Sequence, residues 1–97
     1  MSQPLSWTST GGRLALTGRL NHETLLPLWQ QRDELVKGVS QLDVSGLDQV
    51  DTAGLALLVH LREAAVKQNV TLQVTGITDR LRSLISLYNL QPLMAVD

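Results

Sequence analysis

The sequence predicts a small α/β domain, in which a mixed β-sheet carries helices mainly on one face. Segments in which apolar and polar residues alternate, as in strands, are interleaved with segments in which apolar residues recur at helical spacing. The order is strand, strand, helix, strand, helix, strand, helix (ββαβαβα). Strands joined through helices run parallel, and the opening pair forms a hairpin. With 97 residues and 43% hydrophobic content, the chain suits one modest core, with little room for an enclosed substrate cavity.

The expected strands alternate with a period of two and have one apolar face. Residues 6–10 form a weaker edge candidate, and Gly11 and Gly12 mark a hairpin turn into the next strand. The other strands are expected over residues 13–20, 41–45 and 70–75, with an apolar face made of Leu14, Leu16, Gly18, Leu20, Leu42, Val44, Val70, Leu72 and Val74. Because the alternate positions are polar, helices are expected to cover only one face.

Helical spacing appears in three segments. Their apolar positions are Leu25, Leu28, Trp29, Leu35 and Val36, then Leu57, Leu58, Leu61, Ala64 and Ala65, and finally Ile77, Leu81, Leu84, Ile85 and Tyr88. The two periods together predict a core that includes Leu16, Val44, Leu58, Leu72 and Leu84. Residues 91–97 are compatible with a last strand or a short capping segment, although Pro92 argues against a central strand.

The most informative stretch joins the strand at residues 41–45 to the second helix. A polar loop leads to Asp51, Thr52, Ala53 and Gly54, where the helix begins. The first N–H groups of a helix lack intrahelical partners, and the aligned peptide dipoles favour negative charge there. A hydroxyl with small neighbours at this place can be modified, or can bind a polar group of a partner. The functional prediction therefore centres on Thr52, supported by the other three residues of the loop and helix tip.

These residues also have a purely structural interpretation. Asp51 and Thr52 are good capping residues, because their side chains can accept a hydrogen bond from an early N–H and stabilise the helix by about 1 kcal/mol. Gly54 either lets another backbone approach closely or only relieves crowding against the sheet.

The Asp51 to Gly54 loop, set between a strand and a helix, resembles the hallmark of the STAS domain family, an Asp-Ser/Thr-Ser/Ala/Gly-Gly loop at this place. The resemblance extends to the order of elements over nearly the whole chain. One branch, the small STAS subunits of bacterial phospholipid ABC transporters, is also similar in residues 5–7, 14–18, 25–29, 50–58 and 87–90. The resemblance implies that residues 1–97 form a single STAS domain.

The resemblance also implies a function. A transporter subunit of this kind would be non-catalytic and would bind the cytoplasmic ATPase subunit of the ABC transporter, in complex with a permease and a periplasmic lipid-binding subunit. It would support assembly and activity of the ATPase in maintaining outer-membrane lipid asymmetry. The alternative is an anti-sigma-factor antagonist, which binds a kinase and is released when Thr52 is phosphorylated. Such antagonists commonly carry Ser at this position, which favours the transporter branch.

Composition argues against several other partners. A net charge of −1 gives no electrostatic footprint for nucleic acid or anionic lipid. The chain has no Cys, and His22 and His60 lie far apart without carboxylates at metal-ligand spacing, so we expect no metal and no other cofactor. The longest apolar run, residues 55–59, is far below the roughly 20 residues that span a bilayer. We expect a cytoplasmic chain without direct membrane insertion, peripheral to the inner membrane through a transporter complex.

The residues do not favour an enzyme. Thr52 is the only hydroxyl in a special position, and a nucleophile needs a general base that is itself oriented. Asp51 is too weak a base at an ordinary carboxyl pKa of about 4, and His60 lies about 12 Å further along the helix. The sequence contains no glycine-rich phosphate loop.

Overall fold

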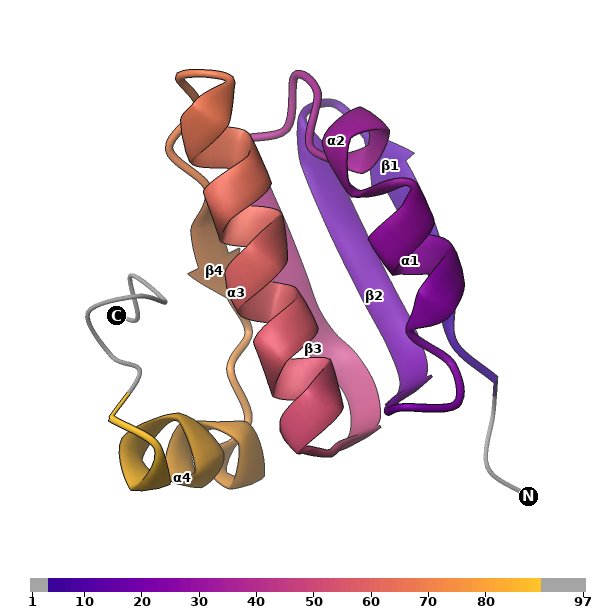
Figure 1. The fold of residues 1–97 in the computed structure, drawn as a ribbon, viewed down its shortest axis with the longest axis vertical. Helices are drawn as coiled ribbons and strands as arrows, with labels where there is room; N and C mark the ends of the chain where they lie inside the picture. Colours follow the sequence, from indigo (N-terminus) through magenta and orange to yellow (C-terminus); the bar gives the residue numbers. More distant parts are fainter. Residues whose placement is uncertain (1–3, 90–97) are drawn as a thin grey trace.

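A computed structural model describes residues 4–89 of the chain as a four-stranded mixed sheet with helices packed on it (Figure 1). The strands are β1 (Ser6–Thr10), β2 (Arg13–Leu20), β3 (Gln41–Val50) and β4 (Gln73–Thr75), in the spatial order β1-β2-β3-β4. β1 is antiparallel to β2, whereas β2, β3 and β4 are parallel. The predicted fold class and element order are thereby confirmed. The prediction for residues 91–97 lies outside the described residues.

The helices are α1 (Leu26–Gln30), α2 (Arg32–Leu35), α3 (Thr52–Lys67) and α4 (Asp79–Leu87). In Figure 1, α1, α2 and α3 cover the same face of the sheet, and α4 lies beside the start of α3. Leu16, Val44, Leu58 and Leu72 are fully buried between these layers, as predicted. Leu84 is only partly buried and packs against the core from outside, whereas it was predicted to lie within the core.

The first predicted helix is divided into α1 and α2 at Gln31. The backbone of Gln31 leaves helical geometry (φ −106°, ψ 13°), and the side chain of Arg32 donates from Nη1 to the carbonyl of Trp29 at 2.7 Å. A carbonyl at a helix end needs such a partner. The break therefore leaves the apolar positions in place, and Leu28 and Val36 are both fully buried.

Strand β3 is twice as long as predicted, because the polar loop expected after Ser45 is the second half of the strand. The register against β2 shifts by one residue in two places, so that Ala15 pairs with Asp43 but Thr17 pairs with Gly46. Each such bulge inserts one residue and inverts the inside–outside alternation. The buried positions consequently change spacing, from two residues between Leu42 and Val44 to three between Val44 and Leu47.

Strand β4 is shorter than predicted, and α4 begins later. The N–H of Val70 donates to the carbonyl of Ala65 at 2.9 Å, closing the end of α3, so this residue does not enter the sheet. Helix α4 starts only after Thr78, whose hydroxyl accepts from the N–H of Leu81 at 3.2 Å.

Asp43 is a buried carboxylate within β3, at a position that the alternation predicted to be polar and outward-facing. It forms an ion pair with Arg13 on β2 and accepts a hydrogen bond from the N–H of Ser45 at 3.0 Å. The Ser45 N–H, helped by the Arg13 guanidinium, holds the pKa of Asp43 below its usual value against the opposing effect of burial. The pair joins two neighbouring strands on the sheet face that lacks α1, α2 and α3.

Candidate functional site

The candidate site lies where two parallel strands end side by side. Leu20, the last residue of β2, pairs with Val50, the last residue of β3. The chain that follows each strand therefore emerges at the same edge of the sheet, which is where α/β proteins commonly place their functional residues. Residues 21–24 on one side and residues 51–54 on the other form this edge.

Asp51 is the capping residue of α3. Its backbone is extended (φ −97°, ψ −176°), and its Oδ1 accepts the N–H of Gly54 at 2.8 Å. Thr52 is the first residue within the helix. Of the two residues that the sequence offered as caps, Asp51 takes this role and Thr52 does not.

Thr52 is exposed, and its hydroxyl makes no hydrogen bond to any residue from 4 to 89. Ala53 beside it is half-buried, and Ala56, one turn further along α3, is exposed. Residues four apart lie on the same face of a helix. Thr52 and Ala56 thus form a narrow surface of small side chains that begins at the helix tip.

Gly54 is buried against the sheet. A Cβ at this position would lie 2.3 Å from the carbonyl oxygen of Leu20, a distance that no real contact allows. The N–H of Asp51 also donates to this oxygen at 3.3 Å. Of the two interpretations open from sequence, the structure favours the second, because the missing side chain lets α3 pack directly on the end of β2.

His22 is a member of the site that the sequence analysis missed. The ring Nδ1 of His22 lies 3.0 Å from Oδ2 of Asp51, and the backbone N–H of His22 donates to the same oxygen at 3.1 Å. The two residues are 29 positions apart, so no local spacing joins them. They become neighbours because Leu20 pairs with Val50, and this pairing follows from the two register shifts between β2 and β3, which the predicted strand ending at residue 45 did not include.

A tight turn holds His22 in place. The side chain of Asn21 accepts from the N–H of Glu23 at 2.9 Å and from the N–H of Thr24 at 3.1 Å. The hydroxyl of Thr24 in turn donates to the carbonyl of Arg19 at 2.8 Å. Asn side chains commonly stabilise turns in this way, and here the turn brings the His22 ring beside the α3 cap.

The His22–Asp51 pair shifts both titrations. The hydrogen bond that the His22 ring donates to Asp51, together with the charges of Asp51 and Glu23, raises the pKa of His22 above its ordinary value. Burial alone would raise the pKa of Asp51, but the N–H of Gly54 and the two contacts from His22 outweigh it and hold that pKa below its usual value. Asp51 is therefore an anion near neutral pH, facing an imidazole that favours its charged form.

This arrangement suits recognition better than proton transfer. Both oxygens of Asp51 are already engaged, and its lowered pKa makes it a still weaker base for the Thr52 hydroxyl. Among residues 4–89, no group of three or more His, Asp or Glu side chains is placed to hold a metal ion.

An aromatic contact continues the surface along α3. The rings of Trp29 and His60 meet edge to face with centroids 5.0 Å apart, and the Arg32 guanidinium lies 3.9 Å from the Trp29 ring centre. His60 is exposed, and its Nδ1 lies 3.8 Å from Oε2 of Glu63. Because His60 follows Ala56 by four residues, the face that starts at Thr52 leads to this cluster.

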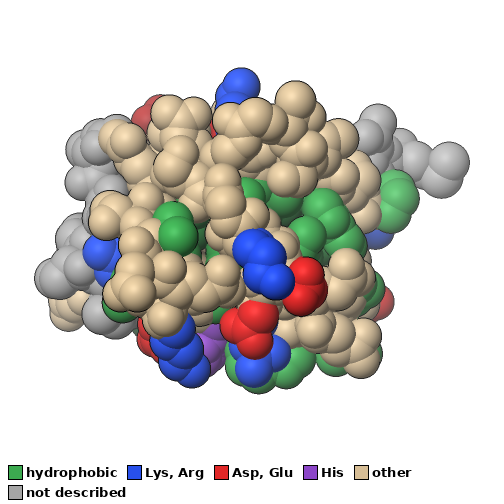
Figure 2. All heavy atoms as spheres, turned by 90° about the horizontal axis from the view of Figure 1, so that it is seen from above, with side chains coloured by type: hydrophobic (Ala, Val, Ile, Leu, Met, Phe, Trp, Pro, Cys, Tyr) green, Lys and Arg blue, Asp and Glu red, His purple; other side chains and the backbone are tan. Residues whose placement is uncertain are grey.

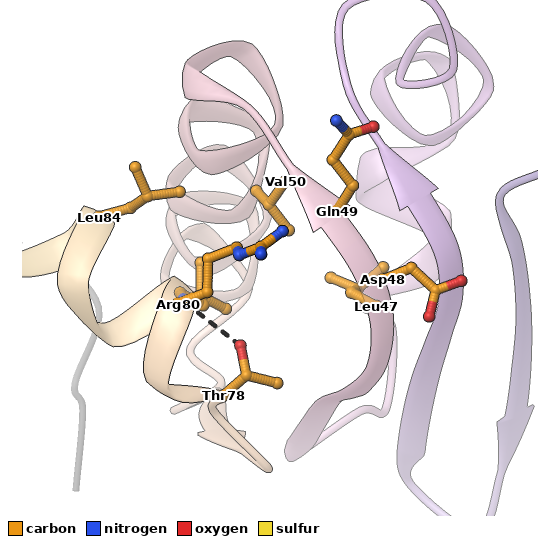
Figure 3. A pocket seen from close by; sticks show the side chains of 8 residues that line it. Leu47, Asp48, Gln49, Val50, Thr78, Arg80 and Leu84 are labelled. Atoms are coloured by element: carbon orange, nitrogen blue, oxygen red, sulfur yellow. Dashed lines mark hydrogen bonds between the residues drawn. The ribbon is translucent and has the colours of Figure 1, made fainter. Parts of the chain in front are cut away.

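A hollow of about 210 Å³ lies on the other side of the tip, between the second half of β3 and α4 (Figure 3). Leu47, Val50 and Leu84 supply apolar surface there, and polar groups come from Thr78, the capping residue of α4, and from Arg80 in its first turn. β4 pairs only with residues 41–43 of β3, so α4 takes the place of a neighbouring strand along this part. The hollow adjoins the tip because Val50 directly precedes Asp51.

The opposite end of the molecule carries mixed charge. Viewed from above, acidic and basic side chains are interspersed there (Figure 2), and the ion pair of Lys37 with Glu34 at 3.6 Å is one example. This end thus presents no patch of a single sign. Within residues 4–89, no helix has the length and apolar character needed to cross a bilayer.

A solved structure shares the fold. The protein in "Structure of the Anti-Sigma Factor Antagonist SpoIIAA in its Unphosphorylated Form" superposes with a TM-score of 0.65 over 86% of this chain and 82% of that one. The sequences are only 10% identical, so the likeness concerns the fold.

The sequence comparisons are more specific. The chain is 53% identical over 92 residues to "Intermembrane phospholipid transport system binding protein MlaB" of Escherichia coli (strain K12), covering 93% of each protein. The protein of the same name from Haemophilus influenzae is 33% identical over 88 residues, covering 84% of each. The sequence model of the family described as "Mlab, STAS domain" matches residues 4–95. The resemblance found from the sequence is thus confirmed, and the chain belongs to the MlaB family of STAS domains.

Proposed function

We propose that this chain is a non-catalytic subunit of the Mla phospholipid transport system that binds the cytoplasmic ATPase subunit of the ABC transporter through the tip of α3. The 53% identity to the E. coli binding protein over 93% of both proteins supports the transport role. In this proposal residues 1–97 form one STAS domain, held at the inner membrane by the ATPase, which works with a permease and a periplasmic lipid-binding subunit. The complex maintains outer-membrane lipid asymmetry.

One observation carries the choice of Thr52 as the contact residue: it is the one polar side chain of the loop that the fold leaves unused. Asp51 caps the helix and binds His22, and Gly54 is required for packing on β2. The Thr52 hydroxyl is exposed and makes no hydrogen bond within the described residues. A partner that brings a carbonyl or carboxylate to the tip finds this hydroxyl and the positive end of the helix dipole together.

The surroundings of Thr52 also favour a closely packed protein partner. Ala53 and Ala56 have short side chains, so another backbone or helix can approach α3 near its start. A bulky or charged side chain at position 52 would have to be desolvated in such an interface without a partner, which is costly.

Co-purification with the ATPase tests this proposal. Thr52→Arg is expected to abolish recovery of the ATPase with the tagged chain, while its thermal melt stays close to that of the wild type. Thr8→Arg is the matched control, because Thr8 is an exposed threonine on β1. Its neighbour Trp7 pairs with the core residue Leu16, so Thr8 points to the other face of the sheet. Thr8→Arg should bind normally. A folded Thr52→Arg protein that recovers as much ATPase as the wild type would remove Thr52 from the interface.

The signalling alternative predicts a different modification state of Thr52 and a different co-purified protein. An anti-sigma-factor antagonist would carry a phosphate on Thr52 in part of the population and would co-purify with a kinase. The structural likeness to SpoIIAA at 10% identity supports only the fold. Intact-mass measurement of the chain purified from its native host, together with identification of the co-purified proteins, separates the two functions.

A further inference from the structure

Capping of α3 uses only half of the Asp51 carboxylate. Oδ1 accepts the N–H of Gly54 at 2.8 Å, and Oδ2 is bound twice by His22, through the backbone N–H at 3.1 Å and the ring at 3.0 Å. A carboxylate held at both oxygens cannot rotate without breaking a bond. The first turn of α3 is thus fixed from the end of β2 as well as from within the helix.

We propose that His22 is a positioning residue for the α3 tip: its ring holds the Asp51 carboxylate, and through it the first helical turn, in the orientation in which Thr52 meets the partner. This inference rests on the docking function proposed above and deepens it, because it makes partner binding depend on the protonation of a residue that need not touch the partner.

The strength of the contact between the His22 ring and the Asp51 carboxylate depends on whether the ring nitrogen Nδ1 carries a proton. The doubly protonated ring donates from Nδ1 to Asp51 and carries its second proton on Nε2, 3.8 Å from Glu23. A neutral ring has one proton, and when that proton lies on Nε2 the lone pair of Nδ1 faces the Asp51 carboxylate. Deprotonation therefore replaces a charge-assisted hydrogen bond by a mixture of a weaker bond and a repulsive contact.

Two charged groups face His22 among the described residues. They are Asp51, at the start of α3, and Glu23, in the same turn as His22. Both are acidic and both favour the imidazolium, which agrees with the raised pKa of His22. Only the Asp51 contact reaches α3, so only this contact can connect the protonation of His22 to the orientation of Thr52.

The first test measures binding of the ATPase across the pH range on both sides of 6.5, the ordinary pKa of histidine. Because the His22 ring is exposed, wild-type affinity should fall by only about two- to fivefold as the pH rises through the His22 pKa, the size typical of an exposed ion pair. His22→Asn places an uncharged N–H donor near the position of Nδ1, so it should bind well at every pH without this fall. His22→Ala removes the ring contact, so it should bind more weakly than His22→Asn throughout.

The second test uses the chain alone and follows the ring resonances of His22 by NMR as the pH is varied. Asp51→Asn should lower the pKa of His22 towards its ordinary value of 6.5. In the ATPase-binding test, Glu23→Gln should keep the fall in affinity, because Glu23 does not contact α3, but should move it to lower pH, because Glu23 also favours the imidazolium.

The outcomes separate this inference from the proposed function. If Thr52→Arg abolishes binding but His22→Ala binds as the wild type does at every pH, the positioning role is wrong and the docking function stands. An unchanged His22 titration in Asp51→Asn also overturns the positioning role. Normal binding by Thr52→Arg overturns the docking function itself, whatever His22 does.

Discussion

Gly54→Ala offers the sharpest test of how α3 is seated on the sheet. Alanine favours a helix over glycine by up to about 1 kcal/mol, so propensity alone predicts a more stable protein. The structure predicts the opposite. The new Cβ would lie 2.3 Å from the carbonyl oxygen of Leu20, 2.9 Å from its carbonyl carbon and 3.0 Å from its Cγ. Because two of these atoms are backbone, either α3 or the end of β2 must move.

Overpacking of this kind typically costs about 1 to 3 kcal/mol, and movement of α3 also strains the N–H of Asp51 bonded to the same carbonyl. We expect Gly54→Ala to lower the free energy of unfolding by at least about 1 kcal/mol, or the melting temperature by roughly 4 to 8 °C per kcal/mol for a domain of this size. Urea and thermal unfolding of the purified chain measure this. Ala56→Gly, on the exposed side of α3, calibrates the propensity effect and should also destabilise. A Gly54→Ala protein as stable as the wild type would refute the close approach of α3 to β2.

Three further substitutions test the core and the tip. Leu58→Ala removes a fully buried side chain of α3 and should cost about 2 to 5 kcal/mol in urea unfolding; a loss below about 1 kcal/mol would show that Leu58 is not in the core. Thr52→Ala removes no cap and should change stability by less than about 0.5 kcal/mol, which a thermal melt checks, and a loss as large as that of a missing cap would contradict the assignment of this role to Asp51. Asp51→Ala removes the cap and should cost about 0.5 to 2 kcal/mol. It should also make the free energy of unfolding less dependent on pH, on the acid and on the alkaline side. The lowered pKa of Asp51 gives stability that is lost as the pH falls through that pKa, and the raised pKa of His22 gives stability that is lost as the pH rises through that pKa.

The sequence predicts the order of elements well because the layers impose strong periodicities. In β2 every second residue from Leu14 to Leu20 is buried, and this alternation is visible without a structure. The second half of β3 could not be found in the same way, since its two bulges shift the buried positions from a spacing of two to a spacing of three. Residues 46–50 therefore lack the period-two pattern by which a strand is recognised in a sequence.

The candidate site was predictable where its residues are neighbours in sequence and hidden where they are not. Asp51 as a cap follows from its place before an apolar helix. The contact of His22 with Asp51 depends on the register of β2 against β3, in which Leu20 faces Val50, and this register changes with each bulge. The role of Gly54 was open from sequence for a related reason, since its crowding partner, the Leu20 carbonyl, also lies on β2.

The parallel pairing of β2 and β3 separates the residues of the loop that hold the fold together from the residue that remains available to a partner. Asp51 caps the helix by accepting the N–H of Gly54 and donates its own N–H to the carbonyl of Leu20, and Gly54 lets α3 pack against that same carbonyl at the end of β2. Position 52 takes part in neither role, so its side chain can change without disturbing the fold. A substitution at position 52 alters the group that the helix tip offers to a partner and changes stability little. A substitution at Asp51 or Gly54 instead destabilises the start of α3. The specificity of this surface should therefore reside in Thr52 and in the exposed residues that follow it along α3.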